Sequence, residues 1–186
     1  STNIDSYFIT HTHLEHIRGA YTLATRGYLS SVYMPTPISN DELTVYSELS
    51  RLGQRYGFEV FVYKSGDSVM PSKDTVINTF SPIRTNTDDF HSLLYYDVVL
   101  AGRHTVYLGQ AASDTDFRSY TLFENADAVV IGCHYPRSKL TFSYRFFNPD
   151  TLLAVCENTG DRIVANVPKT YCEKDGILCL WSGGKE

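Results

Sequence analysis

Residues 4–20 read IDSYFITHTHLEHIRGA and contain three of the chain's six histidines. A strand-like apolar run over residues 4–10 leads into three histidines, His11, His13 and His16. Neutral imidazole is the commonest metal ligand near neutral pH. At the end of a strand, His11 and His13 would project to the same side, and a following turn can bring His16 round to them. The stretch therefore predicts a metal site, and a solvated, histidine-rich loop is the alternative interpretation.

Length and composition predict one soluble domain over residues 1–186. The chain has 186 residues, of which 42% are hydrophobic, so it can bury a sizeable core. It opens almost directly on the histidine motif, which also fits a fragment of a longer chain. No apolar run is long enough to span a membrane, so a membrane is expected only through a parent protein. A net charge of −5 restricts any contact with phosphates to a local patch.

The cysteines do not form a Cys-x-x-Cys pair, which leaves two interpretations open. Buried thiols are expected because Cys156 and Cys179 have apolar neighbours in the sequence. A disulfide is the alternative if the domain is extracytoplasmic. The four cysteines are Cys133, Cys156, Cys172 and Cys179.

Strands and helices are predicted to alternate along the chain. The clearest local signal is Ser39-Asn40-Asp41-Glu42, a capping box that opens a helix reaching about Tyr56. Periodicity and turn residues predict further helices at residues 17–25, 116–124 and 149–157. Strands are predicted at residues 7–10, 31–34, 59–63, 75–80, 93–100, 104–108, 126–131, 162–167 and 176–181. Ala101-Gly102-Arg103 is predicted to join two of them as a hairpin in which His104 is exposed, and Gly66-Asp67 is predicted to be a turn.

The histidine motif resembles that of a known family. His11-x-His13-x-Glu15-His16, after a strand and before Gly19, is similar to the His-x-His-x-Asp-His motif of the metallo-β-lactamase superfamily. Later segments follow in an order that resembles the soluble domain of ComEC-type DNA-uptake proteins. These segments are residues 63–69 (YKSGDSV), 80–82 (FSP), 90–94 (FHSLL), 106–110 (VYLGQ), 126–128 (ADA) and 131–134 (IGCH).

The resemblance implies an α/β (α+β) fold, the αββα sandwich of the superfamily, without the first strands that should precede His11. It implies metal ligation by His11, His13, His16, His91 and His134, with Glu15 as a ligand or catalytic base. The implied cofactor is Zn²⁺ or Mn²⁺, which would lower the pKa of a bound water for hydrolysis.

Departures from the family pattern indicate a degraded metal site. Glu15 stands where the family has Asp, and its extra methylene displaces the carboxylate by about 1.5 Å. Gln110 stands where a Gly-Asp pair supplies an anionic bridge, and a neutral amide is a poor substitute. Cys133-His134 retains one histidine of a His-His-Gly motif. We therefore expect a single weak metal site, or none.

Two classes of function remain open, and the sequence does not decide whether the chain is an enzyme. The first is a metal-dependent phosphodiesterase, the nuclease-like domain of a competence protein, with single-stranded DNA as its partner. The alternative is a non-catalytic structural or interaction module of the same fold, or a stand-alone metallohydrolase. The missing strands predict self-association or association with the upstream segment. A ComEC-type parent implies the extracytoplasmic face of a bacterial membrane, and otherwise the cytoplasm is expected.

Overall fold

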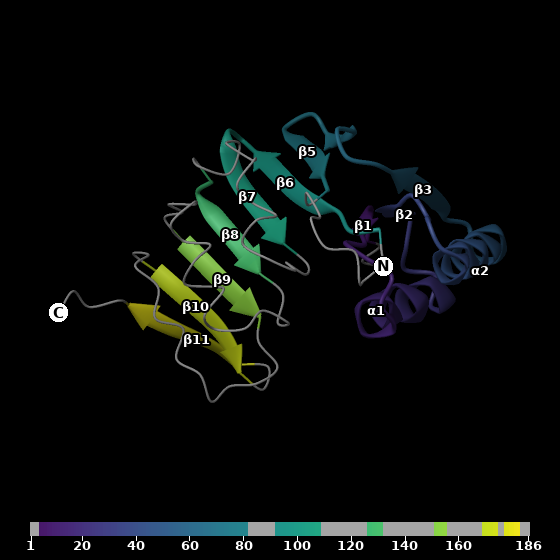
Figure 1. The fold of residues 1–186 in the computed structure, drawn as a ribbon, viewed down its shortest axis with the longest axis horizontal. Helices are drawn as coiled ribbons and strands as arrows, with labels where there is room; N and C mark the ends of the chain where they lie inside the picture. The colour runs from purple at the N-terminus through teal and green to yellow at the C-terminus, as the bar shows by residue number, and fades with distance from the viewer. Residues whose placement is uncertain are drawn as a thin grey trace. The chain divides into compact units, whose positions relative to one another are not determined.

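The computed structural model describes residues 4–81, 92–108, 126–131, 151–155, 169–174 and 177–182. The chain forms two compact units (Figure 1). Residues 1–67, 79–81 and 87–94 make the first unit, and residues 68–78, 82–86 and 95–186 make the second. The single domain predicted over residues 1–186 stays a prediction. Neither helix in the described ranges has the length and apolar character needed to cross a membrane.

The first unit is a small parallel sheet with two helices. Its elements follow in the order β1 (Tyr7–Phe8), α1 (Leu14–Thr25), β2 (Ser31–Pro35), α2 (Asn40–Tyr56) and β3 (Glu59–Tyr63). The sheet order is β1-β2-β3, and both pairings are parallel. Parallel neighbours need a crossover connection, and α1 and α2 supply the two crossovers, lying side by side in Figure 1.

The core of the first unit lies between its helices and the inner face of its sheet. Val32 and Met34, alternate residues of β2, are fully buried against Ile17 of α1 and Leu49 of α2. Alternation along a strand sends Tyr33 to the other face, where its ring stacks on Phe8 at 4.5 Å and on Phe61 at 5.1 Å between ring centroids. Full burial of each such aliphatic side chain stabilises the fold by about 1.5–3 kcal/mol.

The predicted capping box at the start of α2 is confirmed. The Ser39 hydroxyl accepts a hydrogen bond from the Glu42 N–H at 3.3 Å, and the Glu42 carboxylate accepts one from the Ser39 N–H at 3.1 Å. The helix ends at Gly57, whose φ of +81° lies in the left-handed region that favours glycine.

The second unit contains one eight-stranded mixed sheet in the order β11-β10-β9-β8-β7-β6-β5-β4 (Figure 1). The β4/β5, β6/β7 and β10/β11 pairs are antiparallel, whereas β7/β8, β8/β9 and β9/β10 are parallel. The predicted hairpin through Ala101 and Gly102 is confirmed as the β6–β7 turn. The strands are β4 (Ser68–Ser72), β5 (Thr75–Phe80), β6 (Tyr95–Leu100), β7 (Arg103–Leu108), β8 (Ala128–Ile131), β9 (Thr151–Val155), β10 (Lys169–Lys174) and β11 (Ile177–Ser182).

The structure corrects part of the sequence prediction. The helix predicted over residues 149–157 is wrong, because residues 151–155 form β9, held between two parallel neighbours. A short apolar run such as TLLAV does not distinguish a buried strand from a helix. The strands β4 and β10 were not predicted at all. The helix predicted at residues 116–124 and the strand at residues 162–167 lie outside the described residues.

Candidate functional site

The histidine pair of the predicted motif comes together at the end of β1. His11 and His13 lie edge to face, with ring centroids 4.8 Å apart and an interplanar angle of 82°. His11 is buried, with 1% of its surface exposed, and His13 is half-buried. The Nδ1 atom of His11 is 2.9 Å from the Thr10 hydroxyl, where the proton direction depends on the imidazole tautomer. Two imidazoles therefore share one small region of the first unit.

Both ends of the histidine segment are fixed by secondary structure. Before it, the Ile9 N–H donates to the Tyr33 carbonyl at 2.8 Å, which continues the pairing of β1 with β2. After it, His13 is the N-cap residue of α1, and its carbonyl accepts the Ile17 N–H at 3.2 Å. Its backbone is extended, with φ −61° and ψ 138°, so the chain turns from strand to helix at this residue.

Gly19 on α1 lies close to the end of the Tyr7 side chain on β1. A Cβ at Gly19 would lie 2.8 Å from the Tyr7 hydroxyl oxygen, closer than side-chain atoms pack. The glycine that follows the histidine motif in the sequence therefore has a packing role on the strand that leads to His11.

His11 and His13 fit two positions of a metal site. Imidazole nitrogen suits Zn²⁺, whereas Mn²⁺ prefers oxygen ligands, so the pair favours zinc of the two predicted ions. A zinc site needs three or four protein ligands. Within the described ranges, no group of three or more His, Cys, Asp or Glu residues could hold a metal ion. The pair thus supplies part of a ligand set.

The other predicted site residues are placed only in part. The helix α1 begins at Leu14, three residues earlier than predicted, so Glu15 and His16 lie in its first turn and not in a preceding loop. Their side chains lie outside what the structure describes. His91, Gln110 and His134 lie outside the described residues altogether. The ligand and base roles of these residues stay predictions.

Glu42 is a buried carboxylate. Besides capping α2, it accepts hydrogen bonds from a distant segment, which the sequence did not predict. One oxygen, Oε2, accepts the N–H groups of Ile38 at 2.7 Å and Ser39 at 3.1 Å. The other, Oε1, accepts the Ser92 N–H at 2.6 Å and the Ser92 hydroxyl at 2.7 Å. Burial raises the pKa of Glu42, but the hydrogen bonds from Ile38, Ser92 and Ser39 outweigh it, so the pKa is lowered. Glu42 therefore connects the start of α2 to a segment 50 residues away.

That segment also contacts the residue before His11. The N–H of Leu94 donates to the carbonyl of Thr10 at 2.8 Å. Leu93 and Leu94 are both buried, which fixes the segment in the first unit. Local sequence patterns carry no signal for this contact, because it joins residues that only the fold brings together.

A second polar cluster lies on the sheet of the second unit. Buried Asp97 on β6 has its Oδ1 atom 3.2 Å from Nδ1 of His104 on β7, and its Oδ2 atom accepts from Asn78 on β5 at 3.3 Å. The His104 side chain is 42% exposed. The sequence indicated an exposed strand residue and missed this carboxylate partner. A period-two pattern that places Asp inside a strand was the available signal.

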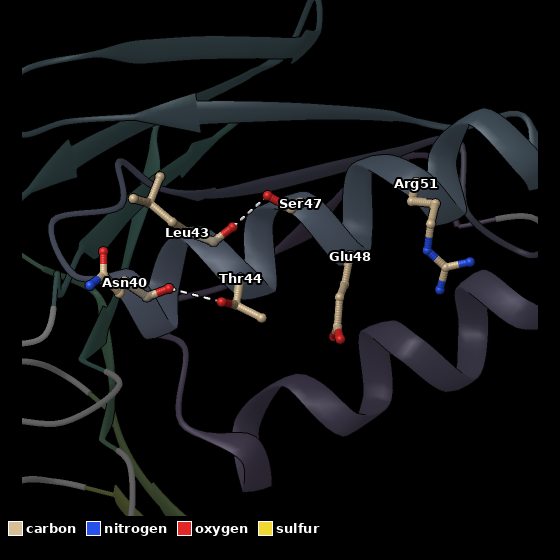
Figure 2. Close-up of a pocket in the computed structure, with 6 residues that line it drawn as sticks. All are labelled: Asn40, Leu43, Thr44, Ser47, Glu48 and Arg51. Atoms are coloured by element: carbon tan, nitrogen blue, oxygen red, sulfur yellow. Dashed lines mark hydrogen bonds between the residues drawn. The ribbon is translucent and has the colours of Figure 1, made fainter.

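A shallow groove of about 540 Å³ runs along one face of α2 (Figure 2). Its Thr44 and Ser47 hydroxyls donate to the helix carbonyls of Asn40 and Leu43, at 2.9 and 2.8 Å. These hydroxyls are therefore engaged in the helix, and the groove contains no histidine or cysteine. Its lining residues are Asn40, Leu43, Thr44, Ser47, Glu48 and Arg51.

Comparison with solved structures identifies the fold. The chain is similar to the metallo-β-lactamase fold protein YhfI from Bacillus subtilis, with a TM-score of 0.70 and 12% identity over 96% of this chain and 78% of that one. It is similar to human tRNase Z, short form, with a TM-score of 0.51 and 14% identity over 80% of this chain and 71% of that one.

A third similar structure is CmlA, a diiron β-hydroxylase from Streptomyces venezuelae, with a TM-score of 0.57 and 15% identity over 83% of this chain. The chain spans only 36% of the length of CmlA. No protein-family model and no curated protein sequence matches the chain. The fold is therefore established by structure alone: an α/β chain with parallel and antiparallel sheets that has the metallo-β-lactamase fold over most of its length.

Proposed function

We propose that the chain is a metal-dependent hydrolase that cleaves phosphodiester bonds, with single-stranded DNA as its substrate class. The observation that carries the proposal is the His11–His13 pair at the end of β1, with ring centroids 4.8 Å apart. The fold supports it in two parts: one structurally similar protein is named as a diiron β-hydroxylase, which supports metal binding, and another is named as a tRNase, which supports nucleic-acid cleavage.

In this proposal His11 and His13 hold one metal ion, and the remaining ligands come from His16, His91, His134 or Glu15. The bound ion would supply a water of lowered pKa and charge stabilisation for the displaced oxygen. Burial of His11 limits the imidazole to few orientations, so its ring would hold the ion from a fixed direction. The net charge of −5 confines attraction of the DNA backbone to this local site.

The finer proposal is that the chain is a domain of a ComEC-type DNA-uptake protein. Its support is the order of segments in the sequence, from residues 63–69 to residues 131–134. Such a parent would place the domain on the extracytoplasmic face of a bacterial membrane. Association with an upstream segment of that parent, or with a second copy, belongs to the same proposal, and light scattering of the purified chain tests the self-association.

The second candidate is a non-catalytic module of the same fold. The observations that favour it are Gln110 in place of an anionic bridge and Glu15 in place of Asp. Both changes weaken a metal centre while leaving the fold intact, because neither removes an apolar core residue.

One experiment separates the two candidates. The purified chain is titrated with Zn²⁺ and Mn²⁺ by calorimetry, and hydrolysis of bis(p-nitrophenyl) phosphate and of a single-stranded oligonucleotide is followed at each metal concentration. We expect Zn²⁺-dependent hydrolysis that is lost in His11→Asn and in His13→Ala. His104→Ala is the matched control and should retain it, because His104 is not one of the predicted ligands. Zinc binding without hydrolysis would favour the non-catalytic module, and no zinc binding at all would reject the metal site.

A further inference from the structure

We propose that Glu42 is a positioning residue for the His11–His13 pair and acts through the segment Ser92–Leu94. The inference rests on the proposed metal site and extends it to a residue outside the histidine motif. The juxtaposition that carries it is a pair of hydrogen-bonded contacts, from Glu42 to Ser92 and from Leu94 to Thr10, that the backbone from Ser92 to Leu94 joins.

The first part of the argument is that Glu42 forms more bonds than a helix cap requires. A capping box needs one hydrogen bond from the N-cap N–H to the carboxylate, and the bond from Ser39 at 3.1 Å meets that need. The other carboxylate oxygen is used entirely by Ser92, through its N–H at 2.6 Å and its hydroxyl at 2.7 Å. Charge-assisted bonds of this length are about twice as strong as neutral ones.

The second part concerns what the Ser92 bonds hold in place. Two residues after Ser92, the Leu94 N–H donates to the Thr10 carbonyl at 2.8 Å. The Leu94 side chain is buried, with 2% of its surface exposed, so the segment cannot shift without exposing apolar surface. Ser92 and Leu94 thus fix the segment at both ends, one on Glu42 and the other on Thr10.

The third part is the connection from Thr10 to the histidines. The Thr10 hydroxyl is 2.9 Å from Nδ1 of His11, and the His11 ring meets the His13 ring edge to face. A partner on one ring nitrogen sets the tautomer and the direction of the other nitrogen, and loss of such outer partners typically weakens metal affinity about 10- to 100-fold. A shift of Thr10 therefore changes how His11 is presented.

The sequence adds a second reason for the same role. His91, one of the predicted ligands, directly precedes Ser92. The hydrogen bonds from Ser92 to Glu42 therefore fix the position of the residue that directly follows His91. One carboxylate is placed to influence two separate parts of the predicted ligand set.

The test compares Glu42→Gln and Ser92→Ala with Ser39→Ala. Ser39→Ala removes the hydroxyl that accepts the Glu42 N–H, so it weakens the helix cap without touching Ser92 or Thr10. Ser92→Thr keeps the hydroxyl and serves as the rescue variant. Urea unfolding first establishes conditions in which every variant is folded. The probe metal is Co²⁺, and the readouts are its dissociation constant and visible spectrum.

We expect Glu42→Gln and Ser92→Ala to weaken Co²⁺ binding about 10-fold or more, with an altered spectrum, while Ser39→Ala and Ser92→Thr bind as the wild type does. The second readout uses metal-free protein: the ring-nitrogen NMR shifts of His11 should move in Glu42→Gln and Ser92→Ala and stay unchanged in Ser39→Ala. If wild type fails to bind Co²⁺, the proposed function is rejected, and the ring shifts alone decide the positioning role. Unmoved ring shifts in folded Glu42→Gln and Ser92→Ala would overturn the inference.

Discussion

The phenolic hydroxyl of Tyr21 on α1 donates to the Glu48 carboxylate on α2, with 2.8 Å between the two oxygens. Burial raises the pKa of Tyr21, and the hydrogen bond and negative charge of Glu48 raise it further. Neutral Tyr21 therefore stabilises the fold below the ordinary tyrosine pKa of 10.0, and this stabilisation is lost as the pH rises through the higher folded-state value.

We expect Tyr21→Phe to lower the free energy of unfolding by about 0.5–1.5 kcal/mol at pH 7, the net contribution of one hydrogen bond. Urea unfolding at pH 7 and above pH 10 measures the difference between variant and wild type, which should shrink at the higher pH. Tyr28→Phe, at an exposed tyrosine of the same unit, is the control. A difference that grows with pH would contradict the assignment.

Glu42 predicts the opposite dependence on pH. Its pKa is lowered in the folded state, so its contribution to stability is present above the ordinary glutamate value of 4.5 and is lost as the pH falls through the folded-state value. Glu42→Gln leaves buried donors poorly satisfied and should cost about 1–3 kcal/mol at pH 7. The cost should diminish in acid, as urea titrations at pH 7 and pH 3 would reveal. Glu59→Gln, at an exposed glutamate, should change stability little at either pH.

Gly53→Ala is predicted to destabilise α2. A Cβ at this position would lie 2.5 Å from the backbone carbonyl oxygen of Phe58, and a backbone atom cannot rotate away. Overpacking of this kind costs about 1–3 kcal/mol. Thermal and urea unfolding measure the loss, and Ser47→Ala on the exposed part of the same helix is the matched control. Equal stability of the Gly53 variant and wild type would mean that the Phe58 backbone shifts to make room for the Cβ at no cost in free energy.

Gln110→Asp is predicted to raise the metal content of the chain. Two close cations repel unless anionic ligands lie between them, and Gln110 supplies no charge at the position where the resemblance in sequence predicts an aspartate. Wild type should therefore retain at most one equivalent of Zn²⁺ through dialysis, and the variant should retain more. Elemental analysis provides the measurement, with Gln54→Asp on α2 as the control. Retention of two equivalents by wild type would contradict the prediction.

Cys172 and Cys179 are predicted to form a disulfide under mild oxidation. They are directly opposed in the antiparallel β10/β11 pair, and opposed residues have Cα atoms about 4.5–5.5 Å apart, within the range that a disulfide requires. Oxidised glutathione would accept both thiol hydrogens as the S–S bond forms. Mass spectrometry after alkylation detects the linked peptides, and Cys133→Ser should leave the reaction unchanged. If both cysteines are still alkylated as free thiols after oxidation, no disulfide has formed and this prediction is wrong.

The sequence predicted best where the signal is local. The capping box of α2, with Ser39 and Glu42, and the β6–β7 hairpin at Gly102 were found as predicted, because a few neighbouring residues determine each one. The turn at Gly66 was also found as predicted, and its φ of +91° lies in the region that favours glycine. The juxtaposition of His11 and His13 also follows from local order, since both lie in the short segment between β1 and α1.

Prediction failed where distant partners decide the outcome. The run over residues 151–155 follows Pro149-Asp150, which resembles a helix start, yet strands β8 and β10 pair with it on both sides. The hydrogen bonds from Ser92 to Glu42 could not be predicted for the same reason, because neither segment's sequence indicates that it contacts the other. The roles of Glu15, His16, His91 and His134 stay predictions from family resemblance.

The distance along the chain between Glu42 and Ser92 sets an order of events during biosynthesis. The two residues are 50 positions apart, so the ribosome synthesises His11, His13 and all of α2 before it adds the serine. Closing so long a loop carries an entropic cost that local helix formation does not. A nascent chain therefore contains both imidazoles before Ser92 can bond Glu42, and under the proposed positioning role a metal ion captured at that stage would be held by a looser pair than one bound after the chain is complete.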